Sequence, residues 1–112
     1  MPGTFEIKRA ADGQTFFRLK ATNGQIILAS EMYKAREGAL KGIESVRTNA
    51  PIAERYSKLT SKDGSFYFTL KAANSEVIGS SEMYKSEASR DEGIDSVMKN
   101  APAAKLVEIA SS

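Results

Sequence analysis

Short stretches of alternating apolar and polar residues open the chain and predict β-strands. Phe5–Arg9 alternates with period two, as a half-buried strand does, and Thr15–Ala21 follows the same pattern. Asp12-Gly13 between them is a strong hairpin signal, because glycine adopts positive φ without steric cost. Asn23-Gly24 makes a second tight turn, and Gln25–Ala29 then completes a three-stranded antiparallel meander.

The period changes after Lys34 and predicts a helix. Apolar residues recur there at steps of three and four, and form one stripe of Ala39, Gly42, Ile43, Val46 and Ala50. Gly38 is the expected N-cap, and Asn49 suits the left-handed residue that follows a helix before a proline. Glycine in mid-helix costs about 0.5–1 kcal/mol relative to alanine, so Gly42 predicts a helix backbone lying close against the sheet.

The whole pattern occurs twice. Ser-Glu-Met-Tyr-Lys stands at residues 30–34 and again at 81–85, and the offset (81 − 30 = 51) aligns 20 of the 40 residues from Asp12 to Pro51 without a gap. The second copy predicts strands at 55–60, 66–72 and 76–79, and a helix whose stripe contains Gly93, Ile94, Val97 and Ala101. Ser89 is expected to start that helix through a capping box, and Asn100 to end it. Lys105–Ile109 is interpreted as a seventh strand.

The opening strands of the two copies correspond poorly. Tyr56 matches Phe5, but Lys58 matches Ile7, and Leu59 is one residue out of phase with the apolar positions. A β-bulge explains the mismatch, and so does a strand that serves both copies. The sequence leaves both explanations open.

Chain length indicates that the copies share a core. A repeat of 51 residues would bury only about 60% of its unfolded surface, which is marginal for independent stability. We therefore expect one domain over residues 1–112, built of interlocked repeats at about 5–55 and 56–109. The predicted class is α+β, with both helices on one face of a single antiparallel sheet.

The helix and the segment before it resemble the YegP-like family of small uncharacterised bacterial proteins. The second copy carries the motif as Ser81–Ser86, then Gly93-Ile94, Ser96-Val97 and Asn100-Ala101-Pro102. The first copy repeats it, except that Ala35 replaces the usual serine. The resemblance implies β-β-β-α-β units that form one pseudo-two-fold symmetric sheet with their last strands exchanged. It implies no assigned activity.

Composition excludes several kinds of chemistry. The chain has no cysteine and no histidine, which removes disulfides, thiolate nucleophiles, Ser-His pairs and Cys or His zinc sites. The net charge of +2 gives no dense basic stripe for nucleic acid. The apolar run Ile26–Ala29 is too short to span a bilayer, and Met1-Pro2-Gly3 opens no signal peptide. We expect a cytoplasmic protein without metal or cofactor, and a monomer with an internal pseudo-dimer or, alternatively, a homodimer.

One candidate site is the sheet face that points away from the helices. The residues predicted there are Phe16, Arg18, Lys20, Tyr67 and Lys71. Aromatic and basic side chains on an open sheet can stack bases and hold phosphates, as in readers of single-stranded RNA. An ordinary solvated sheet face has a similar composition, so weak binding of single-stranded nucleic acid is the alternative function rather than the first.

The duplicated motif is the second candidate site. Two copies could form symmetric pockets with acceptors, stacking rings and anion contacts, which are Glu31, Tyr33, Lys34, Glu82, Tyr84 and Lys85. The structural interpretation is that Met32 and Tyr33 close the end of the core while the serine and glutamate organise the turn. A motif repeated at an element junction more often encodes geometry, so we favour structure.

Catalysis is the third hypothesis. Glu31, Glu82, Asp12 and Asp63 are the available carboxylates, but no pair has a spacing that general acid–base chemistry requires. Asp12 and Asp63 are explained by their turns. We therefore expect a non-enzymatic interaction or binding module.

Overall fold

The computed structural model describes residues 3–109 and shows the predicted alternation of meander and helix twice. The first repeat contains β1 (Thr4–Arg9), β2 (Thr15–Lys20), β3 (Ile26–Ala29) and α1 (Arg36–Asn49). A short 3-10 turn (Ala53–Arg55) leads to the second repeat, which contains β4 (Tyr56–Thr60), β5 (Phe66–Lys71), β6 (Val77–Ser80), α2 (Glu87–Asn100) and β7 (Lys105–Ile109).

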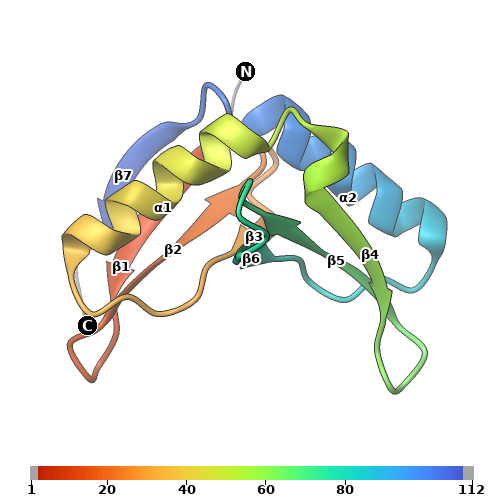
Figure 1. Ribbon diagram of the computed structural model, residues 1–112, viewed down its shortest axis with the longest axis horizontal. Helices are drawn as coiled ribbons and strands as arrows, with labels where there is room; N and C mark the ends of the chain where they lie inside the picture. Colours follow the sequence, from red (N-terminus) through yellow and green to blue (C-terminus); the bar gives the residue numbers. More distant parts are fainter. Residues whose placement is uncertain (1–2, 110–112) are drawn as a thin grey trace.

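All seven strands of the described chain lie in one sheet, in the order β4-β5-β6-β3-β2-β1-β7. The two meanders join at the centre, where Ala29 of β3 pairs with Ser80 of β6. Both helices cover the same side of this bent sheet (Figure 1). The predicted α+β architecture is confirmed, and its one parallel pair is β7 beside β1.

The strand after each helix crosses to the other repeat. β4 follows α1 but pairs with β5, and β7 follows α2 but runs along β1, at the opposite end of the sheet (Figure 1). Lys105 N–H donates to the Gly3 carbonyl at 3.1 Å, and an Arg47 guanidinium nitrogen donates to the Ala104 carbonyl at 2.7 Å. The exchange of last strands implied by the family resemblance is therefore present.

β4 settles the mismatch between the two opening strands. It pairs with β5 in unbroken register from Tyr56↔Leu70 to Thr60↔Phe66, so it contains no bulge. β4 is the strand after α1 and also the first strand of the second meander. Lys58 points toward the helices, where its ammonium group lies 3.2 Å from a carboxylate oxygen of Asp91, and Leu59 is exposed on the other face.

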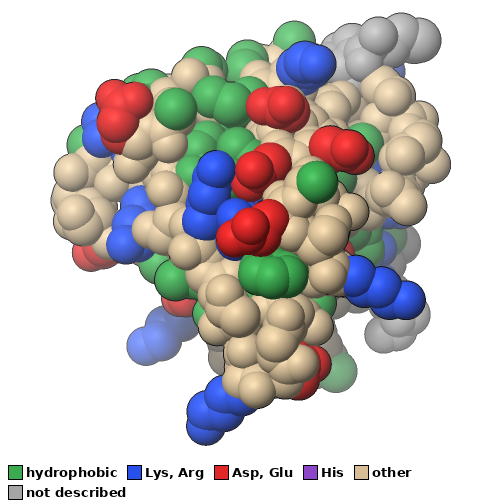
Figure 2. Space-filling view, turned by 90° about the vertical axis from the view of Figure 1, so that its right-hand side faces the viewer, with side chains coloured by type: hydrophobic (Ala, Val, Ile, Leu, Met, Phe, Trp, Pro, Cys, Tyr) green, Lys and Arg blue, Asp and Glu red, His purple; other side chains and the backbone are tan. Residues whose placement is uncertain are grey.

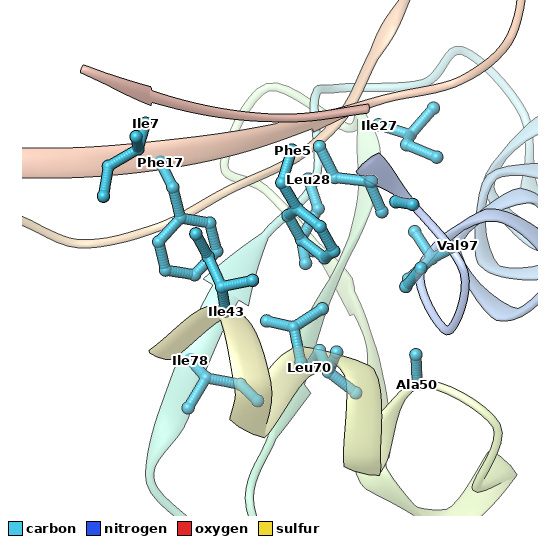
Figure 3. Close-up of a cluster of buried hydrophobic side chains, with 14 of the residues drawn as sticks. Phe5, Ile7, Phe17, Ile27, Leu28, Ile43, Ala50, Leu70, Ile78 and Val97 are labelled. Carbon is cyan, nitrogen blue, oxygen red and sulfur yellow. The ribbon is translucent and has the colours of Figure 1, made fainter. Parts of the chain in front are cut away.

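A shared core fills the space between the helices and the sheet (Figure 3). Its fully buried large side chains come from both repeats: Phe5, Phe17, Leu19, Leu28, Ile43, Val46, Phe68, Leu70 and Val97. At the centre the two repeats are unlike, because Leu28 packs where Gly79 leaves room. A methyl group added to Gly79 would lie 2.7 Å from Leu28 Cγ, so two leucines could not occupy these equivalent places.

The predicted helix ends are wrong by several residues. α2 begins at Glu87, after Ser86, and not at Ser89, because the Ser86 side chain accepts the Ser89 N–H at 3.1 Å. α1 begins after Ala35, not Gly38. At the other end, Asn49 and Asn100 are the last helical residues, with no left-handed backbone. Each donates its side-chain amide to the carbonyl four residues before it.

The mid-helix glycines lie against side chains of the sheet and of the duplicated motif. A Cβ placed on Gly42 would lie 2.5 Å from Tyr33 Oη and 2.8 Å from Phe17 Cε2. Gly93 meets Tyr84 and Phe68 in the same way. The close approach predicted from the sequence is present, and an aromatic side chain of the duplicated motif is the group that requires it.

We predict that Gly42→Ala lowers the free energy of unfolding by about 1–3 kcal/mol, since Phe17 is fully buried and cannot move aside. Chemical denaturation measures the change. Lys41→Ala, one residue earlier and exposed, is the control and should change stability by less than about 0.5 kcal/mol. Unchanged or raised stability of the glycine variant would contradict the packing described above.

Candidate functional site

The open-face residues lie where the sequence placed them, but in two separate groups. Phe16, Arg18 and Lys20 alternate with the buried Phe17 and Leu19 on β2, and so point away from the helices. Tyr67 and Lys71 do the same on β5. Because β3 and β6 lie between β2 and β5, the two groups are separated by about 14 Å along the sheet.

Glu6 neutralises much of the first group. Its carboxylate accepts from Arg18 Nε at 2.8 Å and lies 3.1 Å from Lys20 Nζ. Burial acts to raise the pKa of Glu6, but these two hydrogen bonds and the two positive charges hold it below its usual value. The counterparts of Glu6 and Arg18 in the second repeat are Ser57 and Thr69. The two repeats therefore do not present the same set of aromatic and basic side chains on the open face.

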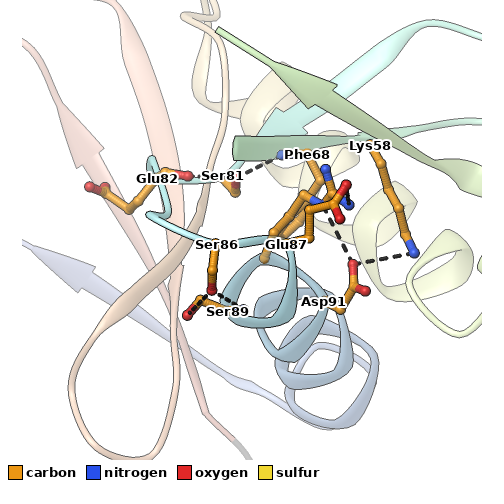
Figure 4. A network of polar contacts seen from close by, with 9 residues as sticks. Lys58, Phe68, Ser81, Glu82, Ser86, Glu87, Ser89 and Asp91 are labelled. Carbon is orange, nitrogen blue, oxygen red and sulfur yellow. Dashed lines mark hydrogen bonds and ion pairs between the residues drawn. The ribbon is translucent and has the colours of Figure 1, made fainter. Parts of the chain in front are cut away.

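The serine and tyrosine of the duplicated motif have structural roles. Ser30 Oγ accepts the Phe17 N–H at 2.9 Å and donates to the Glu31 carbonyl. Tyr33 pairs with Thr15 through the backbone and stacks on Phe17, with ring centroids 6.1 Å apart. Ser81 and Tyr84 repeat each contact (Figure 4 shows Ser81 with Phe68 and Glu82).

The other residues of the motif point into solvent. Met32 and Met83 are 53% and 57% exposed, so the expectation that Met32 closes the core is wrong. The charged residues Glu31, Lys34, Glu82 and Lys85 are exposed as well. Burial, then the nearby Glu31 or Glu82 charge, raises the pKa of Tyr33 and of Tyr84 above its usual value. The motif forms a packed junction in which the serine and the tyrosine are held, while the methionine and the charged residues are exposed.

The residue after the motif distinguishes the two helices. Ser86 caps α2 through its hydroxyl, which accepts the Ser89 N–H (Figure 4). Ala35 stands at the same place before α1 and offers no side-chain acceptor. The sequence had placed the departure from the family pattern at Ala35, and a helix cap is the role that the alanine lacks.

The outer edge of β4 is a site that the sequence did not predict. Ser61 N–H donates to the Ser65 carbonyl, and backbone hydrogen bonds alternate along an antiparallel pair. The backbone N–H and C=O groups of Ser57 and Leu59 therefore point toward β5. The backbone groups of Tyr56, Lys58 and Thr60 therefore point outward. Within residues 3–109 no strand pairs with that edge, although β1, its counterpart, carries β7 there.

One face of α2 borders this edge. Glu87, Asp91 and Asp95 follow one another at steps of four residues and so form one stripe, and Asp91 reaches Lys58 of β4 (Figure 4). Hydrogen bonding to Lys58 is the main cause that holds the pKa of Asp91 below its usual value. We define the edge site as the outer edge of β4 (Tyr56–Thr60) with Glu87, Asp91 and Asp95.

The signal for the edge site was present in the repeat alignment. Lys58 stands where Ile7 does, and Asp91 stands where Leu40 does, so apolar residues of the first repeat become charged in the second. Ile7 is buried beside β7, whereas Lys58 is half exposed. The charged replacements mark the place where a covering strand is absent in the described chain.

Among the residues that the structure describes, no three carboxylates converge closely enough to hold a metal ion. No helix in residues 3–109 has the length and apolar character needed to cross a bilayer.

We predict that Glu6→Gln lowers the free energy of unfolding by about 1 kcal/mol at pH 7. A carboxylate whose pKa is lowered by folding stabilises the fold above its unfolded pKa, about 4.3, and loses that contribution as the pH falls through the folded value. The difference between wild type and variant should therefore shrink below about pH 4. The exposed Glu37→Gln serves as a control, and a pH-independent difference would contradict the ionic role of Glu6.

We predict opposite effects at the two helix starts. Ser86→Ala should cost about 1 kcal/mol of stability, and Ala35→Ser should gain a similar amount, because only a hydroxyl can accept the free N–H groups of the first turn. Thermal and urea unfolding of both variants measure this. Loss of stability in Ala35→Ser would show that the first helix start is arranged differently.

Comparisons with known proteins place both repeats in one family. Residues 10–57 and 61–108 each match the domain of unknown function DUF1508. A UPF0339 protein from the 5′ region of the ptx operon of Stutzerimonas stutzeri is 54% identical over 111 residues, which are 99% of this chain and 100% of that protein. The UPF0339 protein YegP of Escherichia coli is 53% identical over 100 residues, 89% of this chain and 91% of YegP.

Solved structures agree with the fold. The solution structure of E. coli YegP, described as a protein of unknown function, has a TM-score of 0.94 and 48% identity, and the match covers 100% of this chain and 97% of that one. A UPF0339 protein of Shewanella oneidensis has a TM-score of 0.92 with 47% identity, covering 98% and 93%. None of these names assigns an activity, and the resemblance to YegP-like proteins is confirmed. The chain belongs to the DUF1508 family, as a member with two tandem copies of the domain.

Proposed function

We propose that this protein is a non-enzymatic interaction module that binds an extended segment of a partner protein as an additional strand on β4. The observation that carries the proposal is the difference between the two ends of the sheet: β7 covers β1, while the equivalent edge of β4 carries no strand within residues 3–109. Strand addition to an exposed edge is a recurring way of recognising peptides.

The edge of β4 has the groups that strand addition requires. Three residues, Tyr56, Lys58 and Thr60, direct backbone donors and acceptors outward, which are the groups that β1 uses to hold β7. Charged side chains often protect such edges against aggregation. The Lys58 side chain does not extend across the edge, however, because it points to Asp91 on the helix side. The backbone of β4 is accessible to another strand.

A second copy of this chain fits the edge less well than a different partner. Two β4 strands related by a two-fold axis run antiparallel, and the central residue Lys58 would lie near its own copy. Like charges that face each other across strands are destabilising. A two-fold dimer through β4 is therefore disfavoured, and we take a partner of another sequence as the occupant.

The other expectations from the sequence stay predictions. Weak binding of single-stranded nucleic acid is the alternative at Phe16, Arg18, Lys20, Tyr67 and Lys71. It gains no specific support, because the Glu6 carboxylate forms ion pairs with two of these three cations, Arg18 and Lys20. A cytoplasmic location and a monomeric state stay predictions as well.

We predict that short peptides with the sequence of β7 bind at β4. The probes are residues 103–109 of this chain and an analogue with lysine in place of Glu108, added to the uniformly ¹⁵N-labelled protein. Amide resonances of Tyr56, Lys58 and Thr60 should shift, since strand addition engages their N–H groups. Sedimentation at the same concentrations reports any dimer. Absence of β4 shifts with both peptides, or shifts confined to β1 and β7, would contradict the proposal.

Two controls separate strand addition from other contacts. Lys58→Pro removes an outward N–H but leaves the pairing of Ser57 and Leu59 with β5, so the fold should persist while peptide binding falls at least about tenfold. The second control leaves the protein unchanged: a peptide N-methylated at the positions of Lys105, Val107 and Ile109 cannot donate to β4. Equal binding of the methylated peptide would exclude a strand-like complex.

A further inference from the structure

An open cavity of about 440 Å³ lies beside the start of α1, at the end of the sheet opposite to the edge site. The end of β1, the β1–β2 hairpin, the end of β7 and the segment before α1 surround it, and Figure 1 shows these parts together at its left side. Cavities that bind small organic molecules have volumes of about 300–1,000 Å³. The cavity is therefore large enough for such a ligand.

Basic residues dominate the lining of this cavity. Lys8, Arg9, Lys34 and Arg36 line it, and Glu108 is the one carboxylate among the described lining residues. Glu108 forms an ion pair with Arg36, whereas the other three cations form none within residues 3–109. Four cations and one carboxylate leave a net charge of +3. A hollow lined mainly by one sign of charge attracts ligands of the opposite sign.

The cations come from separate elements and so surround the cavity. Arg9 lies on the helix side of β1, because it is two residues from the buried Ile7 and alternate residues of a strand share a face. Arg36 is the first residue of α1. Lys34 precedes that helix, and it is an anion contact that the duplicated motif predicts. An anion in the cavity can be approached by these three side chains from different directions.

Two acidic residues lie close by in the sequence without cancelling this charge. Asp12 stands in the hairpin turn, where its carboxylate accepts the Gln14 N–H at 3.0 Å and the Gln14 Nε2 at 3.1 Å. Glu37 is exposed in the first turn of α1. Neither side chain lines the cavity. Even with both of them counted, the net charge around the cavity is +1.

The backbone at the start of α1 adds hydrogen-bond donors to the same place. Ala35 lines the cavity and offers no side-chain acceptor to the helix. The N–H groups of Arg36 and Glu37 have no partner within the described residues. In α2 the hydroxyl of Ser86 stands at the position of Ala35 and accepts a first-turn N–H. An anion held by the surrounding cations can accept from the free N–H groups of α1.

The second repeat does not reproduce the basic cavity within the described chain. The repeat offset replaces Arg36 by Glu87, which reverses the charge at the helix start. It also replaces Thr15, which lines the cavity, by the larger Phe66, whose ring lies 5.6 Å from the Arg90 guanidinium carbon. Figure 2, which faces that end of the molecule, shows Asp and Glu side chains gathered on one part of the surface. Duplication has therefore left a basic cavity in the first repeat and an acidic surface in the second.

From the cavity and its cations we infer that the protein binds a phosphate monoester of a small organic molecule beside the start of α1. A phosphate monoester carries a charge of about −1.5 to −2 at pH 7 and three acceptor oxygens. Guanidinium, ammonium and backbone N–H groups are the donors that phosphate takes in proteins. The organic part of the ligand lies against the apolar residues of the lining, Ile7, Ala35 and Ile109. This site is independent of strand addition at β4.

Titrations of the uniformly ¹⁵N-labelled protein test the inference. The probes are inorganic phosphate, phenyl phosphate, ribose 5-phosphate and a hexathymidylate, which presents phosphodiesters. The amides of Gly13, Arg36 and Glu37 should shift, and at least one of the two monoesters should bind at least about threefold more tightly than inorganic phosphate. Absence of these shifts with every probe would overturn the site. Tightest binding of inorganic phosphate or of the oligonucleotide at these amides would overturn the assignment to a small monoester.

The duplication supplies a matched control for the charge. Lys34→Ala should weaken binding of the tighter monoester about five- to tenfold, because a charge-assisted hydrogen bond is lost. Lys85→Ala removes the equivalent exposed lysine of the second repeat, outside the cavity, and should leave the affinity unchanged. Glu108→Gln releases Arg36 for the ligand and should tighten binding about threefold. Equal losses in the two lysine variants, or no gain in Glu108→Gln, would contradict the site.

Ala35→Ser separates binding from stability. It places a hydroxyl over the first turn of α1, as Ser86 does in α2, so that the hydroxyl competes with the anion. The affinity for the monoester should fall about threefold while the variant becomes more stable, a combination that a damaged fold does not produce. Unchanged or increased affinity would show that the ligand does not reach the start of α1. None of these outcomes bears on strand addition at β4.

Discussion

The exchange of the strands that follow the helices is the constraint on which the structure depends. The two meanders meet at Ala29 and Ser80, where the backbone joins β3 to β6. The halves are also held together by the shared core beneath α1 and α2, and by the crossing of β4 and β7 to the opposite repeat. Arg47 fastens that crossing, because it donates to the Ala104 carbonyl and lies over the Phe5 ring.

Two repeats that exchange strands in this way leave one place unfilled within the described chain. β4 is both the last strand of the first repeat and the first strand of the second, so one strand belongs to both repeats. Its outer edge consequently has no counterpart of β7. Lys58 replaces Ile7 there, as expected for a side chain that lies near solvent. The edge site is a consequence of duplication with a shared strand.

The sequence predicted most of the fold because duplication doubles every local signal. The Asp-Gly turns, the inward Phe17 and Phe68, and the glycines that approach the sheet were all legible from spacing. The start of α2 was misplaced because Ser86 and Ser89 both suit an N-cap, and only the hydrogen bond distinguishes them. Less of the candidate sites could be predicted from the sequence. The Glu6 ion pairs and the open edge arise from pairing between distant strands, which local periodicity does not report.

Neither repeat is complete without the strand supplied by the other. The most direct measurement is the folding and mass of a chain ending at Ser61, which keeps β1 to β4 but lacks β7 and the second half of the core. Circular dichroism, amide dispersion and sedimentation in dilute solution report both properties. We expect a fragment that is unfolded, or folded only when it associates. A well-dispersed spectrum from a strict monomer would contradict it.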